Sequence, residues 1–233
     1  MRVLSYNLRK NRAVPELTTL VLNHSPDLIC LQEADPQSLP DQIGPLQLVH
    51  STENNRLGLA IYANDERFEP LSAKTFKLKS SMHDRLLSPA HERLLGVHLY
   101  DHEEKQGLVA ASFHAAPLTA LNSLRRHQIE ASHSLLKDLG GGLPSLMVGD
   151  FNYPIFHNLL DSKVRSHGFD MTVSDKRTYT RYKLFRGHFD FATSYGLNVS
   201  KITTLDRGGS DHLPILVEAG YMARSLVSVP VAA

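Results

Sequence analysis

The chain has little cysteine, little net charge and no long apolar segment. Cys30 is the only cysteine among 233 residues, which excludes a disulfide within the chain. The 25 basic and 24 acidic residues leave a formal charge of +1, which excludes the strong basic excess of histones and many repressors. No segment has the length and apolar character of a membrane-spanning helix, and neither coiled-coil heptads nor low-complexity tracts occur. What is present is a hydrophobic content of 42%, enough for one substantial core.

The composition does not shift along the chain, so we expect a single domain over residues 1–219 and a C-terminal tail over residues 220–233. Residues 1–6 have the pattern of a strand and lack the charged start and apolar stretch of a secretory signal. Cys30 lies in an apolar run and suits a small buried position. A cytoplasmic location is the simpler expectation, although a secreted protein whose signal had been removed would begin in the same way.

Two strand-helix-strand passes are predicted, and an acidic residue follows each of them. The elements are expected at residues 3–8, 15–23 and 28–32 in the first pass and at 108–113, 118–139 and 145–148 in the second. Glu33 follows the first pass and Asp150 the second. Further strands are expected at 57–62, 94–99, 189–193, 200–205 and 215–218. This pattern predicts an α/β fold with two sheets, in which two similar halves bring their strand ends to one site.

Five short polar clusters stand beside the apolar runs that are expected to be buried strands. They are Ser5–Asn7, Leu31–Glu33, Ser112–His114, Gly149–Asn152 and Ser210–His212. Carboxylates, amides and imidazoles delivered to one sheet edge repel or desolvate one another unless a metal ion or a phosphate satisfies them. Their recurrence at strand ends therefore predicts a functional site, and the chemistry that they suit is metal-assisted cleavage of a phosphodiester.

These clusters resemble, in the same order along the chain, the motifs of the endonuclease/exonuclease/phosphatase superfamily. The matching segments are Ser-Tyr-Asn-Leu-Arg from Ser5, Leu-Gln-Glu from Leu31, Ser-Phe-His-Ala-Ala-Pro from Ser112, Gly-Asp-Phe-Asn from Gly149, His-Phe-Asp-Phe from His188 and Ser-Asp-His-Leu-Pro from Ser210. The superfamily contains pancreatic-type deoxyribonucleases, abasic-site endonucleases, bacterial sphingomyelinases and inositol-polyphosphate 5-phosphatases. The resemblance implies a four-layered α/β sandwich, in which two mixed β-sheets pack face to face with helices outside. His114 followed by Ala-Ala-Pro resembles the pancreatic-type deoxyribonuclease branch and the sphingomyelinases.

Three oxygen-bearing side chains are expected to hold a divalent cation. A phosphodiester repels a nucleophile and gathers further negative charge in its transition state, so a cation held by carboxylates favours the reaction. Glu33 is the first expected ligand, and Asn7 and Asp211 complete a hard oxygen set that suits Mg²⁺, with Mn²⁺ as a substitute. The resemblance supports the same three positions. Asn7 and Asp211 could instead cap a turn and a loop, which would not explain why both belong to the motifs.

Five further residues are candidates for catalysis. Asp150 and Asn152 would point to the same side of an extended segment, although a plain turn would favour the same Gly-Asp-Phe-Asn sequence. The resemblance implies that Asp150 orients or deprotonates the attacking water and that Asn152 binds a phosphate oxygen or fixes the nucleophile. His212 is expected to donate a hydrogen bond or a proton to the phosphate or its leaving group. The resemblance implies Asp190 as the residue that orients this imidazole, and His114 is a second candidate imidazole.

These residues predict a divalent-metal-dependent phosphodiesterase in which water attacks phosphorus in line with the leaving oxygen. A DNA endonuclease of low sequence specificity is the preferred expectation, with RNA as an open substrate. Between residues 163 and 188 basic residues outnumber acids and alternate with aromatic residues, which suits a phosphate backbone, although a solvated loop explains this segment equally well. Arg56, Arg85 and Arg93 could also reach a phosphate, with a place on the surface as the default.

Two other substrate classes and one other class of protein stay open. A sphingomyelinase-like or other phospholipid phosphodiesterase shares the motifs, but the sequence shows no apolar hairpin for reaching lipid, and we expect no stable membrane insertion. A phosphatase of phosphorylated sugars or inositols is the third enzyme class, because function on a shared fold is decided at the rims of the site. A catalytically inactive binding module would lose the ligands that this sequence keeps. The oligomeric state stays open.

Overall fold

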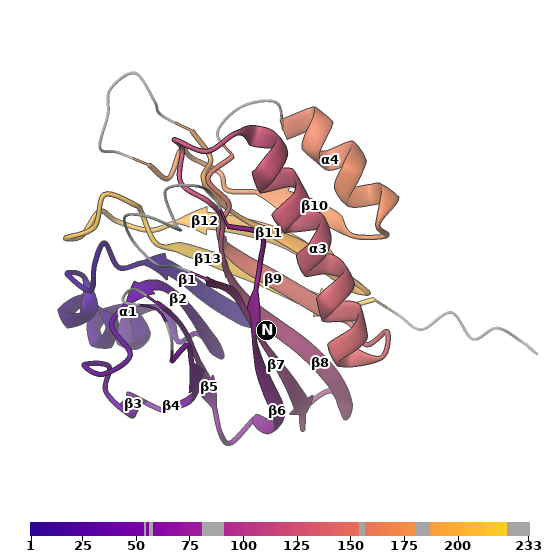
Figure 1. The fold of residues 1–233 in the computed structure, drawn as a ribbon. Coiled ribbons are helices and arrows are strands. Elements are labelled where there is room, and N and C mark those ends of the chain that lie inside the picture. Colours follow the sequence, from indigo (N-terminus) through magenta and orange to yellow (C-terminus); the bar gives the residue numbers. More distant parts are fainter. Residues whose placement is uncertain (54, 56–57, 81–90, 154–156, 180–186, 223–233) are drawn as a thin grey trace, which may run out of the picture.

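The computed structural model describes residues 1–53, 55, 58–80, 91–153, 157–179 and 187–222, and its strands form two sheets (Figure 1). The first sheet consists, in spatial order, of β12 (Leu197–Thr204), β13 (Ile215–Tyr221), β1 (Arg2–Asn7), β2 (Leu28–Ala34), β5 (Gly58–Asn64), β4 (Leu46–Ser51) and β3 (Gln42–Ile43). The second consists of β10 (Asp170–Val173), β11 (Asp190–Tyr195), β9 (Ser145–Asp150), β8 (Gln106–His114), β7 (Glu92–Asp101) and β6 (Phe68–Lys77).

The helices lie outside the two sheets and give the molecule four layers (Figure 1). The 3₁₀ helix η1 (Val14–Glu16) and α1 (Leu17–His24) belong to the first sheet, whereas α3 (Asn122–Gly140) and α4 (His157–Ser166) belong to the second. Val3 packs between the sheets and Leu4 packs on the α1 side, because successive strand residues point to opposite faces. Each such buried Val or Leu contributes about 1.5–3 kcal/mol. The predicted four-layered sandwich of two mixed sheets is confirmed.

One parallel strand pair at the centre of each sheet positions the polar clusters. β1 runs parallel to β2 and β8 runs parallel to β9, so the carboxyl ends of each pair lie at one edge. The register places His114 beside Asp150, and the antiparallel strand β11 places Asp190, its first residue, on the other side of Asp150. Three of the predicted site residues therefore stand on adjacent strands of the second sheet.

The helix predicted over residues 118–139 begins later, at Asn122, because the chain first makes a turn. The carbonyl of Pro117 accepts the N–H of Ala120 and the Nη1–H of Arg125, which closes residues 117–120 on themselves. The helix ends where the sequence predicts, and Gly141 follows in the left-handed conformation with φ 57°. Among the described residues, no helix is long and apolar enough to cross a membrane.

The end expected for the domain falls inside a strand. β13 continues through Tyr221, and Gly220 and Tyr221 pair with Asn198 and Leu197 of β12. Residues 223–233, which form the rest of the expected tail, lie outside the described residues. The division into a domain over residues 1–219 and a tail stays a prediction.

Candidate active site

The strand ends open into a cavity of about 430 Å³. Six of the eight residues predicted for the site line it, namely Glu33, His114, Asp150, Asn152, Asp211 and His212. The other two contact this lining from behind: Asn7 donates from Nδ2 to Asp150 over 3.1 Å, and Asp190 pairs with His212. Segments from both ends of the chain thus meet at one place.

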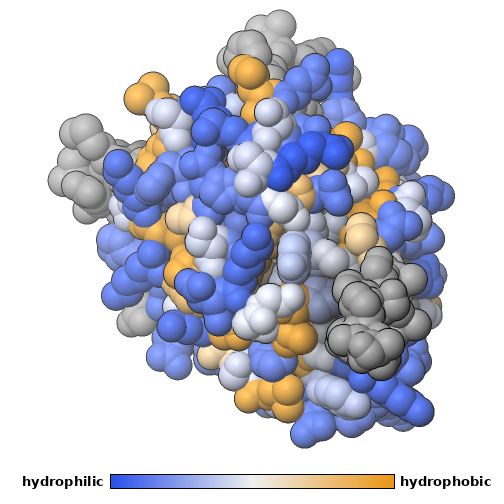
Figure 2. All heavy atoms as spheres, turned by 90° about the vertical axis from the view of Figure 1, so that its right-hand side faces the viewer, coloured by the Kyte–Doolittle hydropathy of each residue, from blue (hydrophilic) through white to orange (hydrophobic). Residues whose placement is uncertain are grey.

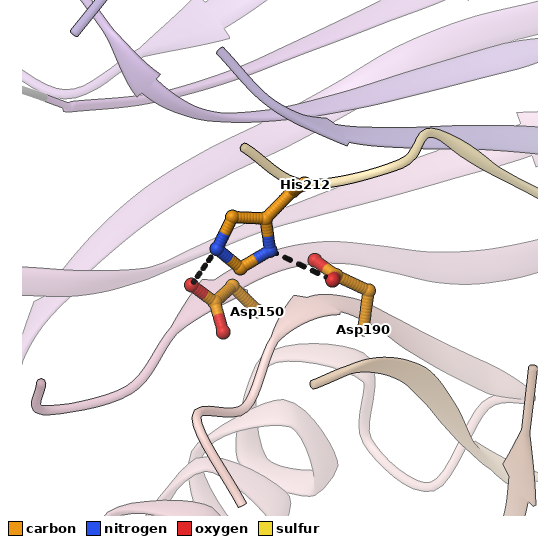
Figure 3. Close-up of side chains that lie close together, drawn as sticks. All are labelled: Asp150, Asp190 and His212. Atoms are coloured by element: carbon orange, nitrogen blue, oxygen red, sulfur yellow. Dashed lines mark hydrogen bonds and ion pairs between the residues drawn. The ribbon is translucent and has the colours of Figure 1, made fainter. Parts of the chain in front are cut away.

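His212 lies between two carboxylates (Figure 3). Its Nδ1 is 2.8 Å from Oδ2 of Asp190, and its Nε2 is 3.6 Å from Oδ2 of Asp150. All three side chains are nearly inaccessible to solvent. Since a carboxylate only accepts, Nδ1 carries the proton in the short contact, which fixes the orientation of the ring.

Burial and mutual charge shift the pKa values of this group. Burial alone would lower the pKa of His212, but Asp190 and then Asp150 outweigh it and raise the pKa well above its ordinary value. Burial also raises the pKa of Asp150, Asp190 and Glu33 add to the rise, and His212 opposes it. These directions favour an imidazolium at His212 and make Asp150 a carboxylate that accepts a proton more readily than an exposed aspartate does.

The turn after β9 holds the carboxylate of Asp150 in place. The N–H of Asn152 donates to Oδ1 over 2.9 Å, and Nδ2 of Asn152 donates to Oδ2 over 3.2 Å. Gly149 has φ 147°, and a Cβ at this position would meet the carbonyl oxygen of Phe113 at 2.0 Å, so the close approach of β8 requires glycine. Phe151 points away and stacks on Phe191. Asp150 and Asn152 of this turn thus also line the cavity.

His114 and His212 contact the same carboxylate oxygen of Asp150, but their pKa values are shifted in opposite directions. Nε2 of His114 is 3.6 Å from Oδ2 of Asp150. Burial, followed by the charges of Arg93 and His212, holds the pKa of His114 well below its ordinary value, which favours the neutral imidazole. Arg93 is buried and donates from Nη1 to the carbonyls of His114 and Ala115 over 3.0 and 2.8 Å, which corrects its expected place on the surface.

The donor set at the cavity fits a hard divalent cation. Carboxylates of Glu33 and Asp211 line the cavity together with that of Asp150, and carboxylate oxygens are the ligands that Mg²⁺ prefers. Asn7 accepts the N–H of Arg9 with Oδ1 over 3.0 Å, which occupies one of the two lone pairs of an amide oxygen. Two of the three predicted ligands, Glu33 and Asp211, thus line the cavity, and Asn7 contacts the lining residue Asp150 from the end of β1.

A second set of potential ligands is the buried group Asp150, Asp190 and His212, whose ligand atoms lie within 4.8 Å of one another. Nδ1 of His212 donates to Asp190, and this arrangement leaves Nε2 as the nitrogen that could ligate a cation. The carboxylates of Asp150 and Asp190 are hard oxygen ligands as well. This group therefore fits a divalent cation as well as proton handling.

Three cations at the rim were missed by the sequence analysis. Arg9, Lys10 and Arg12 line the cavity, and their signal was their position, since Arg9 ends the first motif and the other two follow it closely. Arg9, Lys10 and Asn11 have φ values of 48°, 56° and 67°, a left-handed run that non-glycine residues rarely adopt. Glu33 holds this run, since Oε2 accepts the N–H of Lys10 and its carbonyl accepts the N–H of Asn11, both over 2.9 Å.

The basic segment expected to follow a phosphate backbone is described only in part. Residues 180–186, which carry Arg181, Tyr182, Lys183, Phe185 and Arg186, lie outside the described residues, as do Arg56 and Arg85. Within the described part, Lys163 pairs with Glu130 over 3.0 Å and Arg165 pairs with Asp161 over 2.9 Å. These two cations serve ion pairs around α4, so they add little support for a nucleic-acid surface.

A model of the Endonuclease/Exonuclease/phosphatase family matches residues 4–212, which is most of the chain. This range begins in β1 and ends at His212, so it contains every residue that meets at the cavity. No curated protein matches the chain significantly.

Solved structures share the fold at low sequence identity. The mannosyl-6-phosphatase of Bacteroides thetaiotaomicron has a TM-score of 0.75 at 17% identity, over 95% of this chain and 100% of that chain. TDP2 of D. rerio, in complex with a single-strand DNA product, has a TM-score of 0.75 at 14% identity, over 94% and 98%. The catalytic domain of human Nocturnin has a TM-score of 0.70 at 17% identity, over 95% and 94%. At these identities the likeness establishes the fold alone.

Proposed function

The chain belongs to the endonuclease/exonuclease/phosphatase family, and on this premise we propose that it is a divalent-metal-dependent phosphodiesterase that cuts DNA with little sequence preference. The observation that carries the proposal is the position of His212 between Asp150 and Asp190, at a cavity that Glu33 and Asp211 also line. Such a site can bind a phosphate, orient a water molecule and stabilise negative charge at one point.

Glu33 and Asp211 are the proposed carboxylate ligands of the cation, with Asn7 beside them. When bound, a divalent cation would neutralise charge on the phosphate and on the leaving oxygen. Arg9 already lies 3.7 Å from Oδ1 of Asp211, and the N–H of Lys10 already binds Glu33. These contacts hold both carboxylates at the rim of the cavity before any ligand arrives.

Asp150 is the proposed acceptor of a proton from the attacking water. Asn7 and Asn152 donate to its carboxylate and fix its plane, and its raised pKa makes it a stronger base than an exposed aspartate. As the water oxygen bonds to phosphorus and the bond from phosphorus to the leaving oxygen breaks, one proton of the water passes to Asp150. In-line geometry places the leaving oxygen on the far side of the phosphorus from this residue.

The two imidazoles have different proposed roles. His212 donates its Nδ1 proton in a hydrogen bond to Asp190 and donates its Nε2 proton to a phosphate oxygen. Its raised pKa suits a lasting positive charge better than the release of a proton. The neutral form of His114, which its lowered pKa favours, can donate one hydrogen bond to the same phosphate without adding charge. Each imidazole thus donates one hydrogen bond that stabilises negative charge on the phosphate in the transition state.

The cationic rim supports a nucleic-acid substrate. Arg9, Lys10 and Arg12 line the cavity beside the proposed metal ligands, so a phosphate next to the scissile one could contact them. Contacts of this kind follow the backbone without reading bases. The proposal therefore includes DNA binding that weakens steeply as the salt concentration rises.

A phosphatase of phosphorylated sugars is the second candidate, and the shape of the site favours it. The cavity of about 430 Å³ has the size of a small-molecule pocket. The sugar phosphatase of Bacteroides thetaiotaomicron is covered along its whole length by the match. A sugar phosphate and a DNA strand would use the same carboxylates and imidazoles, so only the substrate distinguishes the two candidates.

The test is nicking of supercoiled plasmid by the wild type with Mg²⁺, with Mn²⁺ and with a chelator. Asp150→Ala is the inactive variant, and absence of nicking in its preparation excludes a contaminating nuclease. Asp161→Ala, which alters an aspartate on α4 away from the cavity, is the matched control that should keep the activity. Phosphate release from a sugar 6-phosphate and hydrolysis of sphingomyelin in vesicles are measured beside it.

The proposal expects metal-dependent nicking by the wild type and by Asp161→Ala and none by Asp150→Ala. Phosphate release without nicking would replace the nuclease by the sugar phosphatase. Full nicking by Asp150→Ala would overturn the role given to this residue.

A further inference from the structure

The pair Asp190 and His212 joins the two sheets. Asp190 is the first residue of β11 in the second sheet, whereas His212 lies just before β13 of the first sheet. Their contact of 2.8 Å therefore depends on how the ends of two separate sheets are held relative to each other. A shift of either end would move Nε2 of His212 relative to Asp150.

We propose that Thr178 is the positioning residue that holds Asp190 and His212 together, an inference that rests on the proposed function of this pair. The side-chain oxygen of Thr178 accepts the N–H groups of Phe189 and Asp190, each over 3.1 Å. Its carbonyl accepts the N–H of Leu213, the residue after His212, over 2.8 Å. One fully buried residue is thus bonded to both segments.

The segment that carries Thr178 is anchored on the first sheet. Asp175 accepts the N–H and the hydroxyl of Thr204 at the end of β12, over 2.7 and 2.6 Å, and its own N–H donates to Ile202 over 3.0 Å. At the other end of this short segment, Tyr179 forms a β-bridge with His212. Residues 175–179 therefore run from β12 to the start of β11 and fix the distance between them.

The bonds of Thr178 are placed to control geometry as well as stability. A donor N–H on Asp190 itself ties the direction of its Cα–Cβ bond to the position of Thr178. Loss of the hydroxyl would leave two buried N–H groups without their acceptor, and the strand end would move to find another. A displacement of about 1 Å at reacting groups can cost about 100-fold in rate, so the effect would exceed that of a lost buried bond elsewhere.

The test compares Thr178→Val with Thr178→Ser. Valine keeps the shape and removes the acceptor, whereas serine keeps the acceptor. We expect Thr178→Val to lower kcat for the phosphoester substrate by about 10- to 100-fold and to leave KM within about 2-fold, because the substrate contacts stay while the reacting groups move. Thr178→Ser should keep kcat near that of the wild type.

A proton NMR spectrum supplies a readout that needs no substrate. The Nδ1 proton of His212, held by Asp190, should give a downfield resonance in the wild type that is absent from Asp190→Asn. We expect Thr178→Val to lose or shift this resonance and Thr178→Ser to keep it. Thr178→Ala replaces Thr178→Val if the latter does not fold.

Thr193→Val is the matched control, because Thr193 is a buried threonine on the same strand β11 whose hydroxyl contacts His133 over 3.0 Å instead. It should keep both the resonance and kcat even if its melting temperature falls. If Thr178→Val behaves like Thr193→Val in both readouts, the inference is wrong. An inactive wild type with an intact resonance that responds to Thr178→Val would count against the proposed function alone.

Discussion

Two buried ionic groups lie at opposite ends of the strands, and they differ in how their charges are balanced. At the cavity, the imidazolium of His212 stands between Asp150 and Asp190. At the other end, Arg67 donates to Asp101 from Nε and Nη2, over 3.2 and 3.0 Å. Asp101 is the last residue of β7 and pairs with Phe68 of β6 and with Gln106 of β8. Gln106 begins β8, whereas His114 ends it. The two groups are thus separated by the length of the sheet.

The difference appears in the pKa values of two buried aspartates. Burial would raise the pKa of Asp101, but the hydrogen bonds and charge of Arg67 outweigh it and lower that pKa, with help from the hydroxyl of Tyr221. Burial raises the pKa of Asp150, and neighbouring carboxylates add to the rise. A guanidinium that binds both carboxylate oxygens satisfies a buried charge, whereas further carboxylates do not. We call Arg67 and Asp101, with the residues paired to them, the far group, and His212, Asp150 and Asp190 the cavity group. We infer that the far group stabilises the fold and that the cavity group serves the reaction.

The largest effect is expected from removing the central cation of the far group. Arg67→Gln would leave Asp27, Asp101 and Glu103 together without their shared partner. Loss of one partner of a buried ion pair costs about 3–5 kcal/mol of stability. Urea unfolding should show this loss, while kcat measured below the unfolding transition should stay near that of the wild type. A large fall in kcat for the folded variant would contradict the inference that the far group acts on stability and not on the reaction.

Removing the central cation of the cavity group should act on the rate of the reaction. His212→Asn is expected to lower kcat by about 100- to 1,000-fold, because one preorganised donor to the phosphate is lost. The variant should also lose stability, because a cation is removed from between two buried carboxylates, so kcat is measured below the unfolding transition. Steady-state kinetics with the substrate identified by the nicking and phosphate-release assays measure the first quantity, and circular dichroism the second. Unchanged kcat would remove His212 from the mechanism.

Metal binding should stabilise the folded protein, and this stabilisation should depend on the residues at the cavity and not on those of the far group. If Mg²⁺ binds the folded protein and is present at 100 times its dissociation constant, the free energy of unfolding should rise by about 2.7 kcal/mol. Glu33→Gln should abolish this rise, whereas Glu103→Gln, which alters the far group, should keep it. The measurement is thermal unfolding with increasing Mg²⁺ and does not depend on the substrate. An equal rise for wild type and Glu33→Gln would place the cation elsewhere.

The smallest effect concerns the acid stability of the far group. The pKa of Asp101 is lowered in the folded state, so its contribution is fully present above the unfolded value of about 3.9 and is lost as the pH falls through the folded value. Asp101→Asn should therefore be less stable than the wild type at neutral pH, and the gap should narrow below pH of about 4. Unfolding free energies across this range measure the gap, and a gap that stays constant would contradict the lowered pKa.

The sequence predicted the parts of the site that depend on local pattern. Strand ends at Asn7, Glu33 and Asp150 follow from short apolar runs with a polar residue after them, and the order of the motifs implied the sandwich that the structure confirms. The left-handed run from Arg9 could not be predicted, because it depends on hydrogen bonds to Glu33, on the next strand. The roles given to the site residues stay predictions.

Contacts between distant segments account for the other omissions. Arg67 and Asp101 are polar residues in surface-like sequence, and only the pairing of β6 with β7 buries them together. Thr178 lies in a segment rich in basic and polar residues, where no periodic pattern marks a buried position. The helix that the apolar spacing predicted from residue 118 begins at Asn122 because Arg125 and Pro117 close a turn first.

The most direct test of this division is the free energy of urea unfolding of Asp150→Asn beside Asp101→Asn. Both variants replace a buried aspartate by an isosteric neutral residue. The raised pKa of Asp150 means that its charge is unfavourable in the folded state, so Asp150→Asn should lose less stability than Asp101→Asn, even though one carboxylate oxygen that accepts an N–H is replaced. Asp101→Asn should be destabilised, because its charge is favourable. A loss of stability in Asp150→Asn as large as that in Asp101→Asn would contradict the account.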